Sequence, residues 1–459
     1  MHKQAFSLLS VALFAALLLA GCGSNSSMMT NRTATAMRTA VVNVGDDPSD
    51  SVLAFEVTIN SILLTDSMGH QTSVLAAPTR IEVTRLAGTF AALAQVTLPP
   101  GSFTGAVITI SKPEITFVNP VGAVVEISPV LASTTVNVAF SPALVVGSTA
   151  AAFNFDFDVA QSVTFDAAGV PSIHPVITVV PATASAAVGL HPENGDVDDL
   201  KGVVSATTAN SFTITVHDGT QSVTFTVDSM TQFSGIGSLA DLKAGMQVEV
   251  AAAAQADGSL LAKKVEVEME LEGDEANGAN LEGLVTATTG NPATQISVLV
   301  RDIESSMPGA PALGSTVNLL VTSNTKFAVN TMDFGVPSLP FTPKFDATTI
   351  TKGQNVEVEA DLASSTPTAA KIKLARQALH GTATGITTSG SVTTFTLTLP
   401  ADSAFLALTG ATTVTVYETS ETELKGLTSV SEGTSVRVRG LLFFDGTTFR
   451  LVAKAIAKT

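Results

Sequence analysis

Three segments in the C-terminal part of the chain repeat one pattern, and this repeat restricts the possible folds more than any other feature. Each segment opens with Leu, one further residue and Gly, and later has a Gly three residues before a Val-x-Val pair. The opening glycines are Gly202, Gly283 and Gly381, and the later ones are Gly245, Gly353 and Gly433. A Gly inside a strand permits a sharp bend, and a repeated unit of this kind is one supersecondary block. The pattern predicts three small closed β-barrels.

The repeats occupy residues 200–268, 281–376 and 379–459. The second is lengthened by an insertion around residues 308–343. The first two carry a Thr-x-Phe motif, at Thr231 and Thr325, whereas the third lacks a clear one. The acidic segment 269–280 is expected to separate the first two repeats as a charged linker.

Each unit resembles the family catalogued as domain of unknown function 5666, and the first unit matches it best. The resemblance rests on the opening Leu-x-Gly, the Thr-x-Phe motif, the Gly before Val-x-Val, and a closing hairpin at Asp257-Gly258 or Asp445-Gly446. It implies barrels of OB-like character.

Residues 40–185 show short alternating strands rich in Val, Thr and Ile, which is typical of an all-β domain. About eight to ten strands at this spacing predict a β-sandwich. A Pro-Gly turn at Pro100 leads into a strand in which Phe103, Val107 and Ile110 are expected to be buried. Further along, Asp156 and Asp158 alternate with phenylalanines and are expected to face solvent.

This N-terminal domain resembles domain of unknown function 4382, a family without an assigned activity. The resemblance rests on Asp46-Asp47-Pro48, on the paired strands 55–59 and 61–64, and on the segment 98–103. A turn-rich linker at residues 186–199 is expected to follow it.

The N-terminus reads as a signal peptide at residues 1–21, because a short basic start precedes an apolar run that is too short to span a bilayer. The motif Leu19-Ala20-Gly21-Cys22 resembles the lipobox of bacterial lipoproteins, and Cys22 is the only cysteine. The resemblance implies that Cys22 is diacylated and becomes the first residue of the mature chain. Residues 22–39 then form a flexible tether. Gly at position 23 favours the outer membrane by the enterobacterial sorting rule.

The formal charge of −17 makes nucleic acid an unlikely partner, since an acidic surface repels phosphate backbones. The chain has no Trp and one Tyr, so aromatic platforms for stacking are scarce. The phenylalanines of the first repeat alternate as core residues do, and we expect them to pack inside the barrel. They are Phe212, Phe225 and Phe233.

Other candidate sites favour structural interpretations. The segment 235–240 imitates a dinucleotide fingerprint, but it lacks a βαβ context and is expected to form a turn before a short helical piece. Glu193, Asp196, Asp198 and Asp199 could bind Ca²⁺, although their spacing is not that of an EF-hand and a solvated acidic linker is preferred. The histidines lie in different units and form no metal-binding motif.

These features predict an all-β, multi-domain lipoprotein of the bacterial cell envelope, anchored in a membrane through Cys22. The barrels are expected to project from a β-sandwich near the membrane. The chain is expected to be a non-catalytic binding or structural module, without cofactor or metal. Its partners would be the membrane and an envelope polysaccharide or protein. In an alternative hypothesis, the barrels specifically bind a saccharide or a peptidoglycan fragment.

Overall fold

The computed structural model describes residues 37–47, 50–146, 151–182, 190, 195–217, 219–267, 278–304, 310–329, 338–362 and 366–459. The signal peptide, Cys22 and the tether as far as residue 36 lie outside the described residues. The first strand begins at Arg38, so the last residues assigned to the tether already belong to the folded domain.

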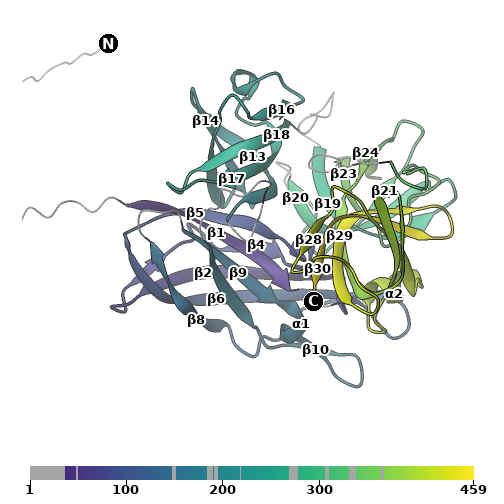
Figure 1. Ribbon diagram of the computed structural model, residues 1–459, viewed down its shortest axis with the longest axis horizontal. Coiled ribbons are helices and arrows are strands. Elements are labelled where there is room, and N and C mark those ends of the chain that lie inside the picture. The colour runs from purple at the N-terminus through teal and green to yellow at the C-terminus, as the bar shows by residue number, and fades with distance from the viewer. Residues whose placement is uncertain are drawn as a thin grey trace, which may run out of the picture. The chain divides into compact units, whose positions relative to one another are not determined.

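The N-terminal domain consists of strands and two short helical turns (Figure 1). Its strands are β1 (Arg38–Asp47), β2 (Ala54–Asp66), β3 (Gln71–Ser73), β4 (Thr79–Glu82), β5 (Phe90–Leu98), β6 (Gly101–Val118), β7 (Val124–Ile127), β8 (Thr135–Val146), β9 (Ala151–Asp158), β10 (Val163–Phe165), β11 (Pro171–Ile173) and β12 (Ile177–Ala182). Its helical turns are η1 (Thr84–Leu86) and α1 (Val159–Ser162).

Two sheets face each other in this domain and enclose one hydrophobic core. One sheet has the order β12-β9-β1-β5, and the other has β3-β2-β6-β7 with β4 paired to β2 and β8 paired to β6. The core takes side chains from both sheets, including Phe55 and Phe157, whose ring centroids lie 5.3 Å apart. Alternating apolar residues from two sheets that share a core define a β-sandwich.

Three details of the sandwich differ from the sequence-based expectations. The strand β5 was not predicted. Val107 is half-buried, whereas its neighbours Ala106 and Ile108 are buried, because the register of β6 shifts between Phe103 and Gly105. The extra residue of such a bulge moves the following side chains to the opposite face. Asp158 is buried rather than solvent-facing, and its carboxylate caps α1 by accepting from the backbone N–H of Gln161 at 2.7 Å.

The described residues of the three repeats form three barrels, each with six strands. Barrel 1 contains β13 (Val197–Thr207), β14 (Ser211–Val216), β15 (Gln221–Thr226), β16 (Gln232–Ser234), the short η3 (Leu239–Asp241), β17 (Gln247–Ala254) and β18 (Leu260–Val267). Barrel 2 contains β19 (Gly278–Thr289), β20 (Gln295–Glu304), β21 (Thr316–Leu320), β22 (Lys326–Val329), β23 (Asn355–Asp361) and β24 (Thr368–Leu374). Barrel 3 contains β25 (Arg376–Ser389), β26 (Val392–Thr398), α2 (Ala404–Thr409), β27 (Thr413–Glu418), β28 (Glu423–Lys425), β29 (Ser435–Phe444) and β30 (Phe449–Lys458).

All three barrels share one strand order. In barrel 1 it is β15-β14-β13-β17-β18-β16, and a parallel pairing of β15 with β18 closes the sheet. In barrel 2 the order is β21-β20-β19-β23-β24-β22, and β21 pairs with β24. In barrel 3 it is β27-β26-β25-β29-β30-β28, and β27 pairs with β30. Apart from the short fourth strand, this is the Greek-key arrangement of the OB fold. The predicted fold class, an all-β chain with a sandwich followed by three OB-like barrels, is confirmed.

The predicted boundaries shift in places. Barrel 1 begins at Val197, inside the segment expected to be a linker. β19 begins at Gly278, inside the segment expected to be the acidic linker, whose residues 269–277 lie outside the described residues. The insertion expected at 308–343 contains two regular barrel strands, β21 and β22, so the extra length of barrel 2 lies on either side of them.

The repeated glycines serve two purposes. A Cβ on Gly283 would lie 2.1 Å from the carbonyl oxygen of Leu299 on β20, so the first two strands can approach closely only without a side chain there. Gly353 has φ +92°, and its N–H donates to Val285 at 2.8 Å. Gly245 and Gly433 repeat this left-handed turn and its hydrogen bond in the other barrels.

The Thr-x-Phe motif has a counterpart in barrel 3 that was missed in the sequence. The hydroxyls of Thr231 and Thr325 donate to backbone carbonyls of the last barrel strand at 2.7 and 2.8 Å. Thr422 makes the same bond, to Ala453 at 2.7 Å, and accepts from the N–H of Thr419 at 2.9 Å. Leu424 takes the place of the phenylalanine, opposite Ile456. The third repeat therefore has a Thr-x-Leu motif, from Thr422 to Leu424, where the first two repeats have Thr-x-Phe.

Replacing Thr422 with valine keeps the side-chain shape but removes both hydrogen bonds of the hydroxyl. We expect the free energy of unfolding to fall by about 1–2 kcal/mol, measured by urea denaturation. Thr398→Val is the matched control, since Thr398 is exposed on β26 of the same barrel. Equal effects of the two substitutions would contradict the assigned role.

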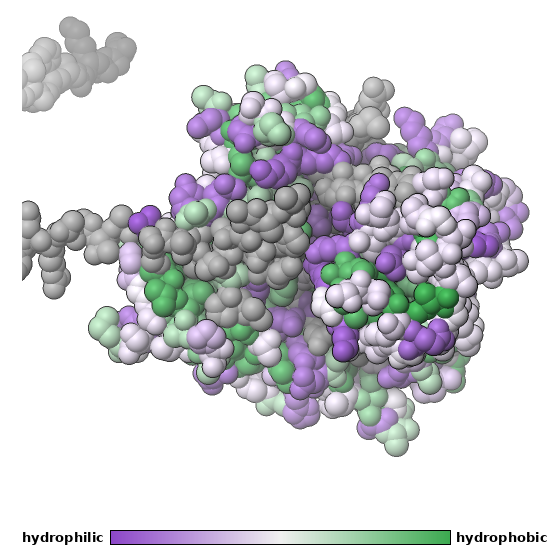
Figure 2. All heavy atoms as spheres, viewed as in Figure 1, coloured by the Kyte–Doolittle hydropathy of each residue, from purple (hydrophilic) through white to green (hydrophobic). Residues whose placement is uncertain are grey.

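The barrels pack against the sandwich and against one another. The barrel 1 core includes Val41, Ala92 and Ala152 from the outer face of the β12-β9-β1-β5 sheet. Leu53 of the sandwich packs with Leu284 of barrel 2 and with α2 of barrel 3. Figure 2 shows that the hydrophobic residues on the visible face occur in small groups among hydrophilic ones.

Candidate functional site

A cluster of buried charges, here called the junction cluster, lies where barrels 1 and 2 meet. It comprises Lys201, Glu249, Glu282, Glu357 and Lys373. The Lys201 ammonium lies 3.3 Å from the Glu282 carboxylate and 3.2 Å from that of Glu357. Lys373 lies 2.6 Å from Glu357 and 3.9 Å from Glu249. Two lysines and three glutamates from two barrels therefore share one network.

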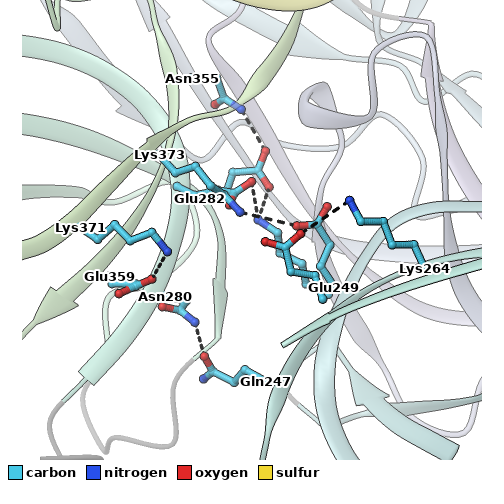
Figure 3. Close-up of polar contacts among 12 residues, drawn as sticks. Gln247, Glu249, Lys264, Asn280, Glu282, Asn355, Glu359, Lys371 and Lys373 are labelled. Carbon is cyan, nitrogen blue, oxygen red and sulfur yellow. Dashed lines mark hydrogen bonds and ion pairs between the residues drawn. The ribbon is translucent and has the colours of Figure 1, made fainter. Parts of the chain in front are cut away.

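Figure 3 shows side chains of the junction cluster directed toward one another from strands of the two barrels. Asn355 adds a neutral donor, since its Nδ2 donates to Glu282 at 2.9 Å. Around the centre, Asn280 donates to Gln247 and Lys371 pairs with Glu359 at 2.8 Å. Glu249 is fully buried and Lys373 is 7% exposed. Charges this deeply buried are retained only with close partners.

The positive charges around the junction cluster keep Glu282 and Glu357 ionised. Burial alone would raise the pKa of Glu282, but the neighbouring Lys201 and Arg85 outweigh it and hold the pKa at about 2. Burial also opposes ionisation of Glu357, and Lys201 and Lys373 together lower its pKa below the ordinary value. Both groups therefore carry their charge at neutral pH.

The junction cluster arises from equivalent positions of the repeats. Lys201 and Glu282 directly precede the opening glycines. On the neighbouring strands β17 and β23, they lie opposite Glu249 and Glu357, the central residues of Val-x-Val. The corresponding pair in barrel 3 is His380 opposite Arg437. A charged or titratable residue before each Gly, with a charged residue inside each Val-x-Val, is the sequence signal that could have identified this face.

A cavity of about 90 Å³, here called the arginine cavity, lies where the sandwich meets barrels 2 and 3. Four arginines line it, although the whole sequence contains nine. They are Arg85 on η1, Arg301 on β20, Arg376 on β25 and Arg437 on β29. Asp50 is the one carboxylate among the described residues that line it. Polar and apolar side chains complete the wall, including Asn355, Gln377, Ser403 and Phe405.

Arg85 and Arg376 have carboxylate partners just beyond the lining. Arg85 pairs with Asp302 at 3.2 Å, and Arg376 pairs with Asp198 at 3.6 Å. Arg301 donates to the carbonyl oxygen of Leu53. Burial lowers the pKa of Arg376, and the nearby Arg439 guanidinium lowers it further despite the attraction of Asp198. Positive charge is therefore concentrated in a chain that is strongly acidic overall.

A hydrogen-bonded chain of Asp50, His380 and Ser435 lies at the edge of this region. Nδ1 of His380 lies 2.5 Å from Asp50, and Nε2 lies 2.8 Å from the Ser435 hydroxyl. The order matches that of a catalytic triad, but Ser435 is not among the lining residues of the arginine cavity, and its hydroxyl also accepts from Thr459 at 2.9 Å. The geometry therefore favours a contact that holds barrel 3 to the sandwich.

The structure places the predicted site residues as follows. Phe212 and Phe225 are stacked in the barrel 1 core, with ring centroids 5.2 Å apart, and Phe233 packs against it half-buried, which confirms the core interpretation. The segment after Gly235 forms the expected turn and then η3.

The expectation of a solvated acidic linker is wrong for two of its residues. Asp196 is 4% exposed and accepts from the N–H of Ala254 at 2.7 Å, because β13 already starts here and packs on β17. Asp198 pairs with Arg376. Glu193 and the side chain of Asp199 lie outside the described residues. Among the described residues, no three His, Cys, Asp or Glu side chains gather as metal ligands would.

The histidines lie apart from one another. His70 is exposed and pairs with Asp66 at 3.0 Å, and Nε2 of His217 contacts the carbonyl oxygen of Ala92 at 3.1 Å. His174 is exposed, and His191 lies outside the described residues. In the part of the chain that the structure describes, no helix has the length and hydrophobicity needed to cross a membrane.

Comparison with known families gives one match. Residues 201–266 match the family described as "Domain of unknown function (DUF5666)", which confirms the resemblance for the first barrel. The resemblance of the other two repeats to this family, and that of residues 40–185 to domain of unknown function 4382, stay predictions. No curated protein matches the chain.

Two solved structures are similar to parts of the chain. Drosophila Unr CSD456 is 13% identical, with 57% of this chain and 98% of that chain covered and a TM-score of 0.14. The single-stranded DNA binding protein from Thermus aquaticus is 12% identical, with 40% of this chain and 93% of that chain covered and a TM-score of 0.15. TM-scores this low carry no argument about function.

Proposed function

We propose that this chain is a non-catalytic binding module of the bacterial cell envelope, anchored in the outer membrane through an acylated Cys22. The arginine cavity is the observation that supports binding, because concave sites where domains meet are common ligand sites. The lipobox-like Leu19-Ala20-Gly21-Cys22 supports the anchor. Repeated barrels joined by buried charges support a rigid scaffold that holds such a cavity in shape.

A saccharide or peptidoglycan fragment is the more specific form of this proposal. Its support is the mixture of amide, hydroxyl and aromatic side chains in the cavity wall, at Asn355, Gln377, Ser403 and Phe405. Sedimentation with purified peptidoglycan sacculi tests it. Saturable sedimentation supports this form, and a flat titration removes it.

Replacing Cys22 with serine tests the anchor. We expect the wild-type chain to fractionate with outer membranes and to carry acyl groups on Cys22 by mass spectrometry. Cys22→Ser should be soluble, since an alkyl chain contributes about 0.8 kcal/mol of membrane affinity per buried CH₂. Ser24→Ala, just outside the motif, should behave as the wild type. An unmodified Cys22, or membrane association that survives the substitution, would refute the anchor.

A further inference from the structure

The arginine cavity has a chemical character that points to one class of ligand. Guanidinium groups form paired, charge-assisted hydrogen bonds with planar carboxylates and with phosphates. Four of the nine arginines in a chain of net charge −17 line this one cavity. They come from four elements that are distant in sequence, so neither a charged run nor a single helix face explains the concentration.

The contacts around the cavity leave one donor of Arg301 for an anion. Asp302 and Asp198 form ion pairs with Arg85 and Arg376. Asp50 is directed at His380, which it meets at 2.5 Å. Arg301 contacts a neutral carbonyl oxygen, that of Leu53, and its Nε is buried without a hydrogen-bond partner among the described residues. A ligand oxyanion beside Arg301 would accept the hydrogen bond from Nε that no described residue of the cavity wall accepts.

The cavity also limits the size of the ligand. A volume of about 90 Å³ accommodates several water molecules or one oxyanion with a small substituent. A terminal anionic group of a larger molecule fits this volume. The apolar side chains of Leu53, Leu284 and Phe405 in the wall would contact the carbon atoms next to that group.

We propose that the arginine cavity binds a terminal carboxylate or phosphate group of an envelope molecule, with Arg301 as its principal contact. This inference rests on the proposed binding function and names the ligand class of the same site. Arg301 on β20 would then bind a ligand in addition to being part of a barrel strand.

Isothermal titration of the full chain in detergent tests the inference with three probes. Inorganic phosphate and galacturonate present the two possible anions, and galactose is the neutral analogue of galacturonate. We expect saturable binding of at least one anion and none of galactose. Whichever anion binds tells whether phosphate or an acidic sugar is the source of the charge.

Arg301→Gln should weaken anion binding about tenfold or more, since a lost charge-assisted hydrogen bond is worth about 1.5–3 kcal/mol. Arg301→Lys keeps the charge and should show an intermediate loss. Arg450→Gln is the control, because Arg450 packs on Phe341 and pairs with Asp445 away from the cavity. If Arg301→Gln does not fold, the comparison of Arg301→Lys with Arg450→Gln decides.

The inference is overturned if neither anion binds, or if the Arg301 variants bind as the wild type does. If neither anion binds but the chain still sediments with sacculi, the binding function stands without this ligand class. If an anion binds although Cys22 is not acylated, the site stands and the membrane anchor fails.

Discussion

Replacing Lys201 with methionine is expected to lower the stability of the chain by about 3–5 kcal/mol, because removing one partner from a buried ion network leaves a buried excess of negative charge. Lys201 contacts both Glu282 and Glu357 at 3.2–3.3 Å, so its loss leaves two carboxylates facing each other. Scanning calorimetry should show the transition of barrels 1 and 2 at a lower temperature. Lys263→Met, on an exposed position of β18, is the matched control.

A double variant separates charge from packing. In the double variant Lys201→Met/Glu357→Gln, a neutral amide replaces one of the two carboxylates that lost contact with Lys201. We expect part of the lost stability to return. Such coupling between two substitutions measures their interaction. If Lys201→Met costs no more than Lys263→Met, the junction cluster does not hold the barrels together.

Replacing Glu56 with glutamine is expected to stabilise the chain at neutral pH. Glu56 is fully buried on β2, and neither of its carboxyl oxygens has a hydrogen-bond partner among the described residues. Its neighbours across the sheet are Glu82 on β4 and Glu114 on β6. Burial, followed by repulsion from Glu82, raises the pKa of Glu56 to about 9, and the opposing attraction of Arg80 is too weak to prevent this.

The sign of the pH dependence follows from these values. Between the ordinary pKa of 4.5 and about 9, the folded chain holds a proton at Glu56 that the unfolded chain releases. Stability therefore falls as the pH rises through this window and levels off above it. Glu56→Gln removes this contribution, which amounts to about 3 kcal/mol near pH 7.

Urea denaturation at several pH values checks this prediction. The wild type should lose stability from pH 5 to pH 8 relative to Glu56→Gln, and the two curves should converge at low pH. Glu421→Gln is the control, because Glu421 is an exposed carboxylate between β27 and β28 of barrel 3. Parallel curves for wild type and Glu56→Gln would show that Glu56 is already ionised in the folded chain.

Much of the fold follows from period-two alternation and from the repeated glycines, whereas features set by neighbouring strands do not. β5 contains three alanines, which have little preference for strands, and it is held by pairing with β1. The bulge at Phe103 and Gly105 changes which face Val107 occupies, and it depends on the partner strand β8. Neither effect can be predicted from the local sequence pattern of a single strand.

The candidate site was less predictable than the fold. Lys201 and Glu282 stand beside glycines that the sequence pattern identified, yet nothing in one repeat indicates that its outer face meets another repeat. The arginines of the cavity are separated by up to hundreds of residues, from Arg85 to Arg437, and only tertiary packing brings them together. Their joint function could not be read from local motifs.

The junction cluster also limits how these repeats can be rearranged. The same position holds lysine in the first barrel and glutamate in the second, so each repeat fits its neighbour through opposite charge. Exchanging the two barrels, or inserting another copy of either, would change which side chains meet at this centre. The three repeats are therefore distinct parts with a fixed order, and duplication of one unit would not extend the protein as it extends a modular array.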